Sequence, residues 1–272
     1  MGKMSKRLTS LITTLVLTTG LLCGAGLFKS PVKAYAANTE ITADYGLADN
    51  TQEGVILHAW NWSFNTIKEN LPKIAEAGYT SVQTSPIQGT KENSMGTDHW
   101  WVLYQPTNFK IGNAQLGSRD EFKSMCEEAK RYGIRIIVDV VSNHMANTAE
   151  NKYKFSTAIE DKYEAREFWH EYDNPHGIDY GSRYSITHDC MDLPDLNTSN
   201  KTLQNDIITF LNDAIDCGAD GFRFDAAKHI ELPDDPDGSD FWPTILSNLK
   251  NKEDLFIYGE ILDTNGGNSR TS

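Results

Sequence analysis

The sequence is short of cysteine and of positive charge, and each shortage argues against a class of protein. Four cysteines occur in 272 residues. The three beyond residue 36 (Cys126, Cys190 and Cys217) have neither the spacing of a disulfide framework nor that of a zinc motif. Lysine and arginine number 25 against 38 acidic residues, a formal net charge of −13. Such an acidic chain is not expected to bind nucleic acid or an anionic membrane surface.

Long apolar runs are also missing, except at the start of the chain. Residues 8–27 are apolar, follow a basic start and precede the small-residue pattern Ala34-Tyr35-Ala36. Glycines interrupt the run, which makes it a poor membrane span, so we predict that residues 1–36 are a secretory signal peptide. The protein is then expected to be secreted and extracellular, with no membrane partner after processing.

The rest of the chain alternates strand and helix patterns, which indicates parallel β/α units. Strands are expected at residues 55–60, 79–84, 134–141, 219–230 and 255–259. Helices are expected at residues 66–76, 118–132, 202–217 and 242–249. Ser118 and Glu121 form a capping box at the start of the second helix.

Five strands do not close an eight-stranded barrel, so a doubly wound open sheet is an alternative on counting alone. However, Trp60-Asn61-Trp62 follows the first strand, where a nucleotide-binding fold would carry a glycine-rich phosphate loop. Residues 143–201 have weak periodicity and are rich in His, Asp, Asn and Tyr. A connection of this length favours an inserted subdomain over a linker.

Polar residues gather where the predicted strands end, which in parallel β/α folds is the functional face. They are His58, Gln83, Asp139, Asn143, His144, Arg223, Asp225, Lys228, His229 and Glu260, and Trp60 is a further candidate after the first strand. Each alone is explained by the need of a strand end to meet water. Together they predict a reaction site.

Asp225 and Glu260 are the most informative pair, because they end neighbouring strands. Parallel strands lie roughly 4.8 Å apart, so the two carboxyl groups are expected within roughly 5–6 Å, the separation found in retaining glycosidases. We expect Arg223 to help keep Asp225 ionised and Glu260 to be buried and to hold its proton near neutral pH. A purely structural ion pair of Arg223 with Asp225 is the alternative.

Five segments resemble the alpha-amylase family of glycoside hydrolases, in the order of that family. They are residues 100–106, 139–144, 193–197, 221–229 and 258–260. The resemblance implies an α/β fold, a (β/α)8 TIM-barrel catalytic domain with an inserted subdomain after the third strand. The chain stops after about the fifth strand and lacks the family's later His-Asp motif, so we expect an N-terminal fragment of a longer protein.

The resemblance also implies a role for each matching residue. Asp225 would be the nucleophile, Glu260 the general acid and then base, and Arg223 would orient Asp225. The other substrate-binding residues would be Trp101, Tyr104, Gln105, His144, Lys228 and His229. Tyr104 would stack on the sugar that His144 hydrogen-bonds, and one of Trp100 and Trp101 is expected to pack in the core.

Calcium fits the oxygen-rich composition of the inserted segment. Family resemblance assigns Asn143 and Asp195 by side chain and His229 by its carbonyl group. A further ligand is expected from the insert, with Asp161, Glu164 and Asp173 as candidates. His188 and Asp189 beside Cys190 suggest another metal, but a solvated loop is the favoured interpretation.

The predicted organisation is a signal peptide (1–36), a first part of the barrel (37–142), a calcium-binding insert (143–201) and the incomplete remainder of the barrel (202–272). The predicted function is endo-acting hydrolysis of internal α-1,4-glucosidic bonds of starch with retention, by a protein that is monomeric when full length. Alternatives are a related glucan transglycosylase or maltogenic enzyme. For this chain alone, which is expected to be inactive, the alternative is a non-catalytic glucan-binding fragment.

Overall fold

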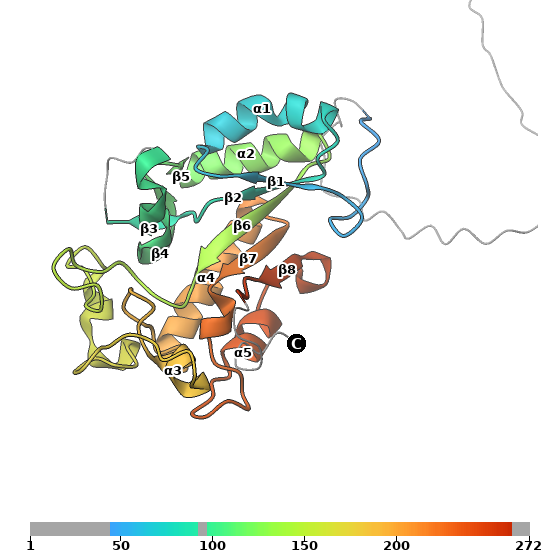
Figure 1. Cartoon of the computed structure of the whole chain (residues 1–272). Helices are drawn as coiled ribbons and strands as arrows, with labels where there is room; N and C mark the ends of the chain where they lie inside the picture. The colour runs from blue at the N-terminus through green and yellow to red at the C-terminus, as the bar shows by residue number, and fades with distance from the viewer. Residues whose placement is uncertain (1–43, 92–96, 263–272) are drawn as a thin grey trace, which may run out of the picture. The chain divides into compact units, whose positions relative to one another are not determined.

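A parallel sheet forms the centre of the structure, a computed structural model that describes residues 44–91 and 97–262 (Figure 1). Its strands are β1 (Ile56–Ala59), β2 (Ser81–Thr84), β6 (Arg135–Val141), β7 (Gly221–Asp225) and β8 (Phe256–Gly259). They lie in the order β1-β2-β6-β7-β8, and every neighbouring pair is parallel. All five lie within the segments predicted as strands, whereas the predicted signal peptide lies outside the described residues.

The helices follow the predicted periodicity. The α-helices are α1 (Phe64–Glu76), α2 (Arg119–Arg131), α3 (Arg183–His188), α4 (Lys201–Cys217) and α5 (Phe241–Ser247). The 3₁₀ helices are η1 (Thr97–Tyr104), η2 (Asp161–Glu164), η3 (Arg166–Phe168), η4 (Ala227–His229) and η5 (Lys252–Asp254). The predicted capping box of Ser118 and Glu121 begins α2, and Gly218, with φ of 113°, ends α4. None of the helices in the described ranges has the length and apolar character needed to cross a membrane.

One face of the sheet is covered by helices. Val82, Ile136, Val138, Phe222 and Phe224 are fully buried and belong to one apolar core with the inward faces of α1, α2 and α4. Along this face α1 packs on α2, α2 on α4 and α4 on α5, and Figure 1 shows α1 and α2 side by side above the strands. The helices on this face therefore lie in the order in which they occur along the chain, as the strands of the sheet do.

The other face of the sheet is concave and polar. The hydroxyl group of Tyr258 on β8 donates a hydrogen bond to Gln83 on β2, although two strands lie between them. Such a contact requires a curved sheet, and the strand order follows the chain order without the reversal of a doubly wound sheet. The open-sheet alternative is therefore wrong: the described strands form part of a (β/α)8 barrel.

A small antiparallel sheet was not predicted. It is made of β3 (Gln88–Thr90), β4 (Pro106–Asn113) and β5 (Gly117–Ser118). β3 and β5 have three and two residues, too few to carry a period-2 pattern, and β4, with eight residues, was missed. The amide of Gln88 bridges this sheet to the main one, because its nitrogen donates to the carbonyl of Val141 at 2.8 Å.

The predicted insert folds onto the carboxyl end of β6. Residues 143–201 contain η2, η3 and α3 but no strand of the main sheet. Isolated bridges join His144 to Asp195 and Trp169 to Leu196. The beginning and the end of this segment therefore lie beside each other, directly beyond the strand from which it leaves.

Candidate active site

The register of β7 and β8 places two acidic residues at the same level. Phe224 pairs with Gly259, and the N–H group of Glu260 donates to the carbonyl of Phe224 at 2.8 Å. Asp225 and Glu260 are thus the next residues along the two strands, as expected. The same register places Asp139 of β6 opposite Arg223 of β7.

The guanidinium of Arg223 holds three carboxylates together. Its Nη1 donates to both oxygens of Asp139, at 2.7 and 2.9 Å, and to Oδ1 of Asp225 at 2.9 Å. Its Nη2 lies 2.9 Å from Oε1 of Glu260, whose other oxygen accepts from the N–H group of Ala226 at 3.1 Å. We call Arg223, Asp139, Asp225 and Glu260 the Arg223 cluster. Arg223 therefore positions both predicted catalytic carboxylates, not only Asp225.

Three carboxylates around one cation leave the Arg223 cluster short of positive charge. Burial, followed by the charge of Asp139, raises the pKa of Asp225 to about 7 against the opposing effect of Arg223. Burial also raises the pKa of Asp139 to about 6, although Arg223 donates hydrogen bonds to it. Arg223 lowers the pKa of Asp225, as expected of a residue that helps to keep it ionised, but desolvation and a second buried carboxylate outweigh this effect. Glu260, which was expected to be buried, has 30% of its side chain exposed.

Aromatic rings border the Arg223 cluster. The hydroxyl group of Tyr104 donates to Oδ2 of Asp139 at 2.9 Å. The ring of Trp100 lies edge-on to Tyr104, with centres 6.0 Å apart, and edge-on to Trp60 at 4.9 Å. Trp60 and Trp100 are 47% and 41% exposed. These two tryptophans were not among the predicted substrate-binding residues, although the position of Trp60 directly after a strand pointed to it.

The two tryptophans of η1 differ in surroundings but not in exposure. Trp101, the predicted substrate-binding residue, is 38% exposed, and the Nζ atom of Lys91 lies 5.7 Å from the centre of its ring. Trp100 instead joins the aromatic group beside the Arg223 cluster. The prediction that one of this pair packs in the core is wrong, since both are exposed.

His144 and Gln105 are the predicted sugar-binding residues on the inner side of Tyr104. His144 is 1% exposed, its Nε2 lies 3.1 Å from the carbonyl of Tyr104, and burial lowers its pKa to about 4. The ring is therefore neutral at physiological pH. Nδ1 of His144 and Oε1 of Gln105 are buried without a hydrogen-bond partner in the described part of the chain. Their contact with a sugar stays a prediction.

Lys228 and His229 follow β7 on η4, and both are buried. The Nζ atom of Lys228 donates to the carbonyl of Leu262 at 2.5 Å and lies 5.2 Å from the ring centre of Tyr180. Nδ1 of His229 lies 2.9 Å from the carbonyl of Ile186, and burial lowers the pKa of this ring to about 4. Both side chains therefore contact the insert, and their predicted contact with substrate is not tested by the structure.

Asn143 and Asp195, two of the predicted calcium ligands, meet at the base of the insert. Nδ2 of Asn143 donates to Oδ1 of Asp195 at 2.9 Å, and both residues are buried. Within the described ranges Oδ1 of Asn143 has no hydrogen-bond partner. Burial raises the pKa of Asp195 to about 7, although His170 donates to it. An unpartnered amide oxygen beside a desolvated carboxylate fits a cation that prefers oxygen ligands.

The further calcium ligands expected from the insert differ in burial from Asn143 and Asp195. Asp161, Glu164 and Asp173 are exposed, and Asp173 forms an ion pair with Arg166. The prediction that one of them completes the site is not supported by these positions. Side chains of this kind are common on solvated loops, so composition alone did not distinguish them.

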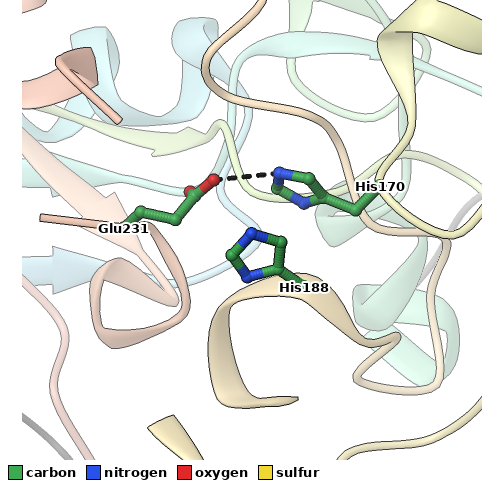
Figure 2. A group of neighbouring side chains, drawn as sticks. All are labelled: His170, His188 and Glu231. Carbon is green, nitrogen blue, oxygen red and sulfur yellow. Dashed lines mark ion pairs between the residues drawn. The ribbon is translucent and has the colours of Figure 1, made fainter. Parts of the chain in front are cut away.

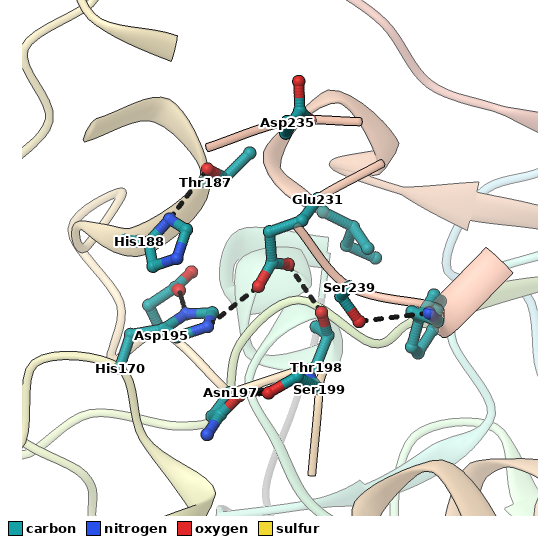
Figure 3. Close-up of polar contacts among 12 residues, drawn as sticks. His170, Thr187, His188, Asp195, Asn197, Thr198, Ser199, Glu231, Asp235 and Ser239 are labelled. Carbon is teal, nitrogen blue, oxygen red and sulfur yellow. Dashed lines mark hydrogen bonds and ion pairs between the residues drawn. The ribbon is translucent and has the colours of Figure 1, made fainter. Parts of the chain in front are cut away.

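A second polar group at this junction was not predicted. His170 lies between two carboxylates, with Nδ1 2.7 Å from Oδ2 of Asp195 and Nε2 2.9 Å from Oε1 of Glu231. The ring of His188 lies beside it, with centres 4.3 Å apart (Figures 2 and 3). We call His170, His188, Asp195 and Glu231 the His170 cluster. Burial lowers the pKa of His170, but hydrogen bonds to both carboxylates outweigh it and raise the pKa to about 10.

The position of His188 corrects an earlier interpretation. His188 and Asp189 are each 5% exposed, so they do not belong to a solvated loop. The only hint in the sequence was the His-Asp pair itself, together with Glu231 two residues beyond the matched segment 221–229. His170 lies in a stretch without periodicity, so no pattern in the sequence indicated its place in this cluster.

Comparisons with known proteins agree with this geometry. The family model for the alpha amylase catalytic domain matches residues 63–270. An alpha-amylase of Clostridium acetobutylicum is 46% identical over 95% of this chain and 35% of its own length, and one of Butyrivibrio fibrisolvens is 41% identical over 82% and 25%. The chain thus spans about a third or less of the length of these curated relatives.

Solved structures show the same fold. A mutant alpha-amylase I of Eisenia fetida in complex with maltohexaose superimposes with a TM-score of 0.66 at 24% identity, over 80% of this chain and 46% of that one. An alpha-amylase of Geobacillus thermoleovorans in complex with acarbose gives a TM-score of 0.63 at 19% identity, over 79% and 48%.

Proposed function

The chain belongs to the alpha-amylase family of glycoside hydrolases, and on that basis we propose that the full-length protein cleaves internal α-1,4-glucosidic bonds of starch and related glucans. The observation that carries this proposal is that Asp225 and Glu260 end neighbouring strands and contact one guanidinium. The oligosaccharide-like ligands named for the two solved relatives support an α-glucan as the substrate class.

The proposed reaction is a double displacement with retention. In the first step an oxygen of Asp225 attacks the anomeric carbon while Glu260 donates its proton to the leaving glycosidic oxygen. The C–O bond breaks and an ester joins the sugar to Asp225. In the second step the carboxylate of Glu260 removes a proton from water, whose oxygen attacks the same carbon and releases Asp225. Two inversions leave the configuration unchanged.

The Arg223 cluster provides the fixed geometry that these two reaction steps require. Arg223 holds Asp225 and Glu260 in fixed positions, so little reorganisation is needed when charge moves between them. The charge of Arg223 favours the ionised form of Asp225, which is the form that attacks the sugar. Asp139, which is fully buried, cannot touch a sugar and acts only through its charge and its contact with Arg223.

The aromatic group beside the cluster suits the substrate. Tyr104, Trp100 and Trp60 form a row of rings, and two of the three are exposed. The C–H faces of pyranose rings pack on such surfaces. We therefore assign this row to substrate binding, together with Trp101 at the other end of η1.

We further propose that Ca²⁺ is held by the side chains of Asn143 and Asp195 and the carbonyl of His229. When bound, the ion would stabilise the ionised form of Asp195 and tie the insert to the sheet. A chelator is expected to lower the Tm of the full-length protein, and calcium alone should restore it. Asn143→Ala should weaken that restoration. An unchanged Tm after chelation would contradict the assignment.

The proposed secretion rests on the basic start, the apolar run and the pattern that ends at Ala36. Expression of the full-length gene should release a protein into the medium whose first residue, read by N-terminal sequencing, lies near residue 37. Retention inside the cell with an intact N-terminus would overturn this proposal.

The products of soluble starch test the proposed activity. Hydrolysis should yield mixed linear maltooligosaccharides, and NMR of the fresh products should show the α anomer first. Cyclic or transferred glucans would instead identify a transglycosylase, and maltose alone a maltogenic enzyme. Products that first appear as the β anomer would overturn the proposed mechanism.

A further inference from the structure

Three side chains of the His170 cluster direct one ligand atom each to a common point. Among the described residues, His170, His188 and Glu231 place a nitrogen or a carboxylate oxygen within 4.8 Å of one another (Figure 2). Glu231 is 1% exposed and His188 5%. We propose that these three residues bind a divalent transition-metal ion of the zinc class, at a site separate from the proposed calcium site.

Each of the three residues uses its other polar atom to contact a second partner (Figure 3). Nδ1 of His170 contacts Asp195 at 2.7 Å, and Nδ1 of His188 lies 2.8 Å from the hydroxyl oxygen of Thr187 and 3.1 Å from the carbonyl of Tyr184. The hydroxyl group of Thr198 donates to Oε2 of Glu231 at 2.5 Å. Outer contacts of this kind orient the ligands of metal sites and select the ring tautomer. They leave Nε2 of each histidine directed toward the common point.

The contact between His170 and Glu231 is short and buried. Nε2 of His170 lies 2.9 Å from Oε1 of Glu231, a residue that is 1% exposed. A proton shared by these two groups would need no third partner. The convergence of His188 on the same point supplies a third ligand and favours a metal ion.

The donor atoms select the class of ion. Two imidazole nitrogens and one carboxylate oxygen are a set that zinc accepts at about 2.0–2.2 Å, with a fourth position for water. Calcium prefers oxygen alone. Asp195 stands between the two proposed sites, because its Oδ1 faces Asn143 and its Oδ2 faces His170.

The site joins two parts of the chain. His170 and His188 belong to the insert, whereas Glu231 follows β7 and η4, directly beyond the Arg223 cluster. The ring of Tyr184 stacks on His188, with centres 4.1 Å apart and planes 11° apart. A bound ion would therefore cross-link the insert to the segment that carries Asp225, and would stabilise the fold instead of taking part in bond cleavage.

Metal binding by the full-length protein tests the proposal. Metal is removed from the full-length protein, saturating Ca²⁺ is added back, and Zn²⁺ is then titrated in by calorimetry. The zinc content of the protein is measured by plasma mass spectrometry. One equivalent of zinc should bind, and Co²⁺ in its place should give the intense visible bands of a four-coordinate ion. His188→Gln, which breaks no ion pair, should weaken zinc binding by at least about 100-fold.

His176→Gln is the matched control. His176 also lies in the insert, but its side chain is 54% exposed and its nearest carboxylate is Asp189 at 3.4 Å. This variant should bind zinc as the parent does. Absence of bound zinc, or equal binding by the parent and His188→Gln, would overturn the proposal and leave the cluster as a proton-bridged ion pair.

Discussion

In both the Arg223 cluster and the His170 cluster a cation partly neutralises buried carboxylates, but the cation differs. Each holds carboxylates from separate segments around one buried positive charge, at the carboxyl end of the parallel sheet. A guanidinium remains charged at any physiological pH, so the Arg223 cluster can release or take up protons only on its carboxylates. An imidazole can exchange its proton for a metal ion.

This difference matches the proposed roles. A retaining glycosidase needs one carboxyl group that holds a proton for the leaving oxygen and a second, ionised carboxylate that attacks the sugar. The cation beside them should not exchange protons with either group. A cross-link between the insert and the sheet needs an occupant that binds tightly and stays. The predictions below test whether the two clusters are divided in this way.

The largest effect is expected from Asp225→Asn. Without the nucleophile no glycosyl ester forms, so starch hydrolysis by the full-length protein should fall by roughly 10³–10⁵-fold. Its unfolding free energy should not fall, since the change removes repulsion from Asp139. Asp213→Asn, an exposed aspartate paired with Arg119, is the control and should keep full activity. Substantial residual activity in Asp225→Asn would contradict the assignment.

Glu260→Gln should have the next largest effect. Loss of the proton donor should lower starch hydrolysis by roughly 10²–10⁴-fold. Substrates with activated aryl leaving groups need no proton, so their first step should be much less affected. Rates are compared on soluble starch and on an aryl maltooligosaccharide. Equal losses on both would argue against the acid role of Glu260.

Arg223→Met tests the cation itself. It leaves Asp139 buried without a positive partner, which should lower the unfolding free energy by roughly 3–5 kcal/mol in urea titrations. Arg166→Met removes an exposed pair with Asp173 and should cost under about 1 kcal/mol. Similar losses in both variants would show that the Arg223 cluster is not a desolvated one.

The smallest effect is a change of stability with pH. The pKa of Asp225 is raised to about 7, so the folded chain keeps a proton that the unfolded chain releases near pH 4. This contribution is complete below about pH 4 and is lost as the pH rises toward 7. Asp225→Asn cannot titrate, so its stability relative to the parent should increase between pH 4 and 7. A constant difference in urea unfolding would contradict the raised pKa.

Much of the catalytic region was predictable because its signals are local. Phe222 and Phe224 alternate with Arg223 and Asp225, which marks a strand with one apolar and one charged face. Parallel pairing then places Glu260 beside Asp225 without knowledge of any other contact. In the small antiparallel sheet, in contrast, β3 and β5 are too short to carry a pattern.

The sequence by itself determined the helices and strands of the barrel and the pairing of Asp225 with Glu260, because periodicity is a local property and neighbouring parallel strands end at the same edge of the sheet. Only the tertiary structure decided that burial and Asp139 outweigh Arg223 at Asp225, since a pKa depends on desolvation and on charges brought together through space. It alone also placed His170, His188 and Glu231 around one point, because those residues come from loops that meet only when the insert folds onto the sheet.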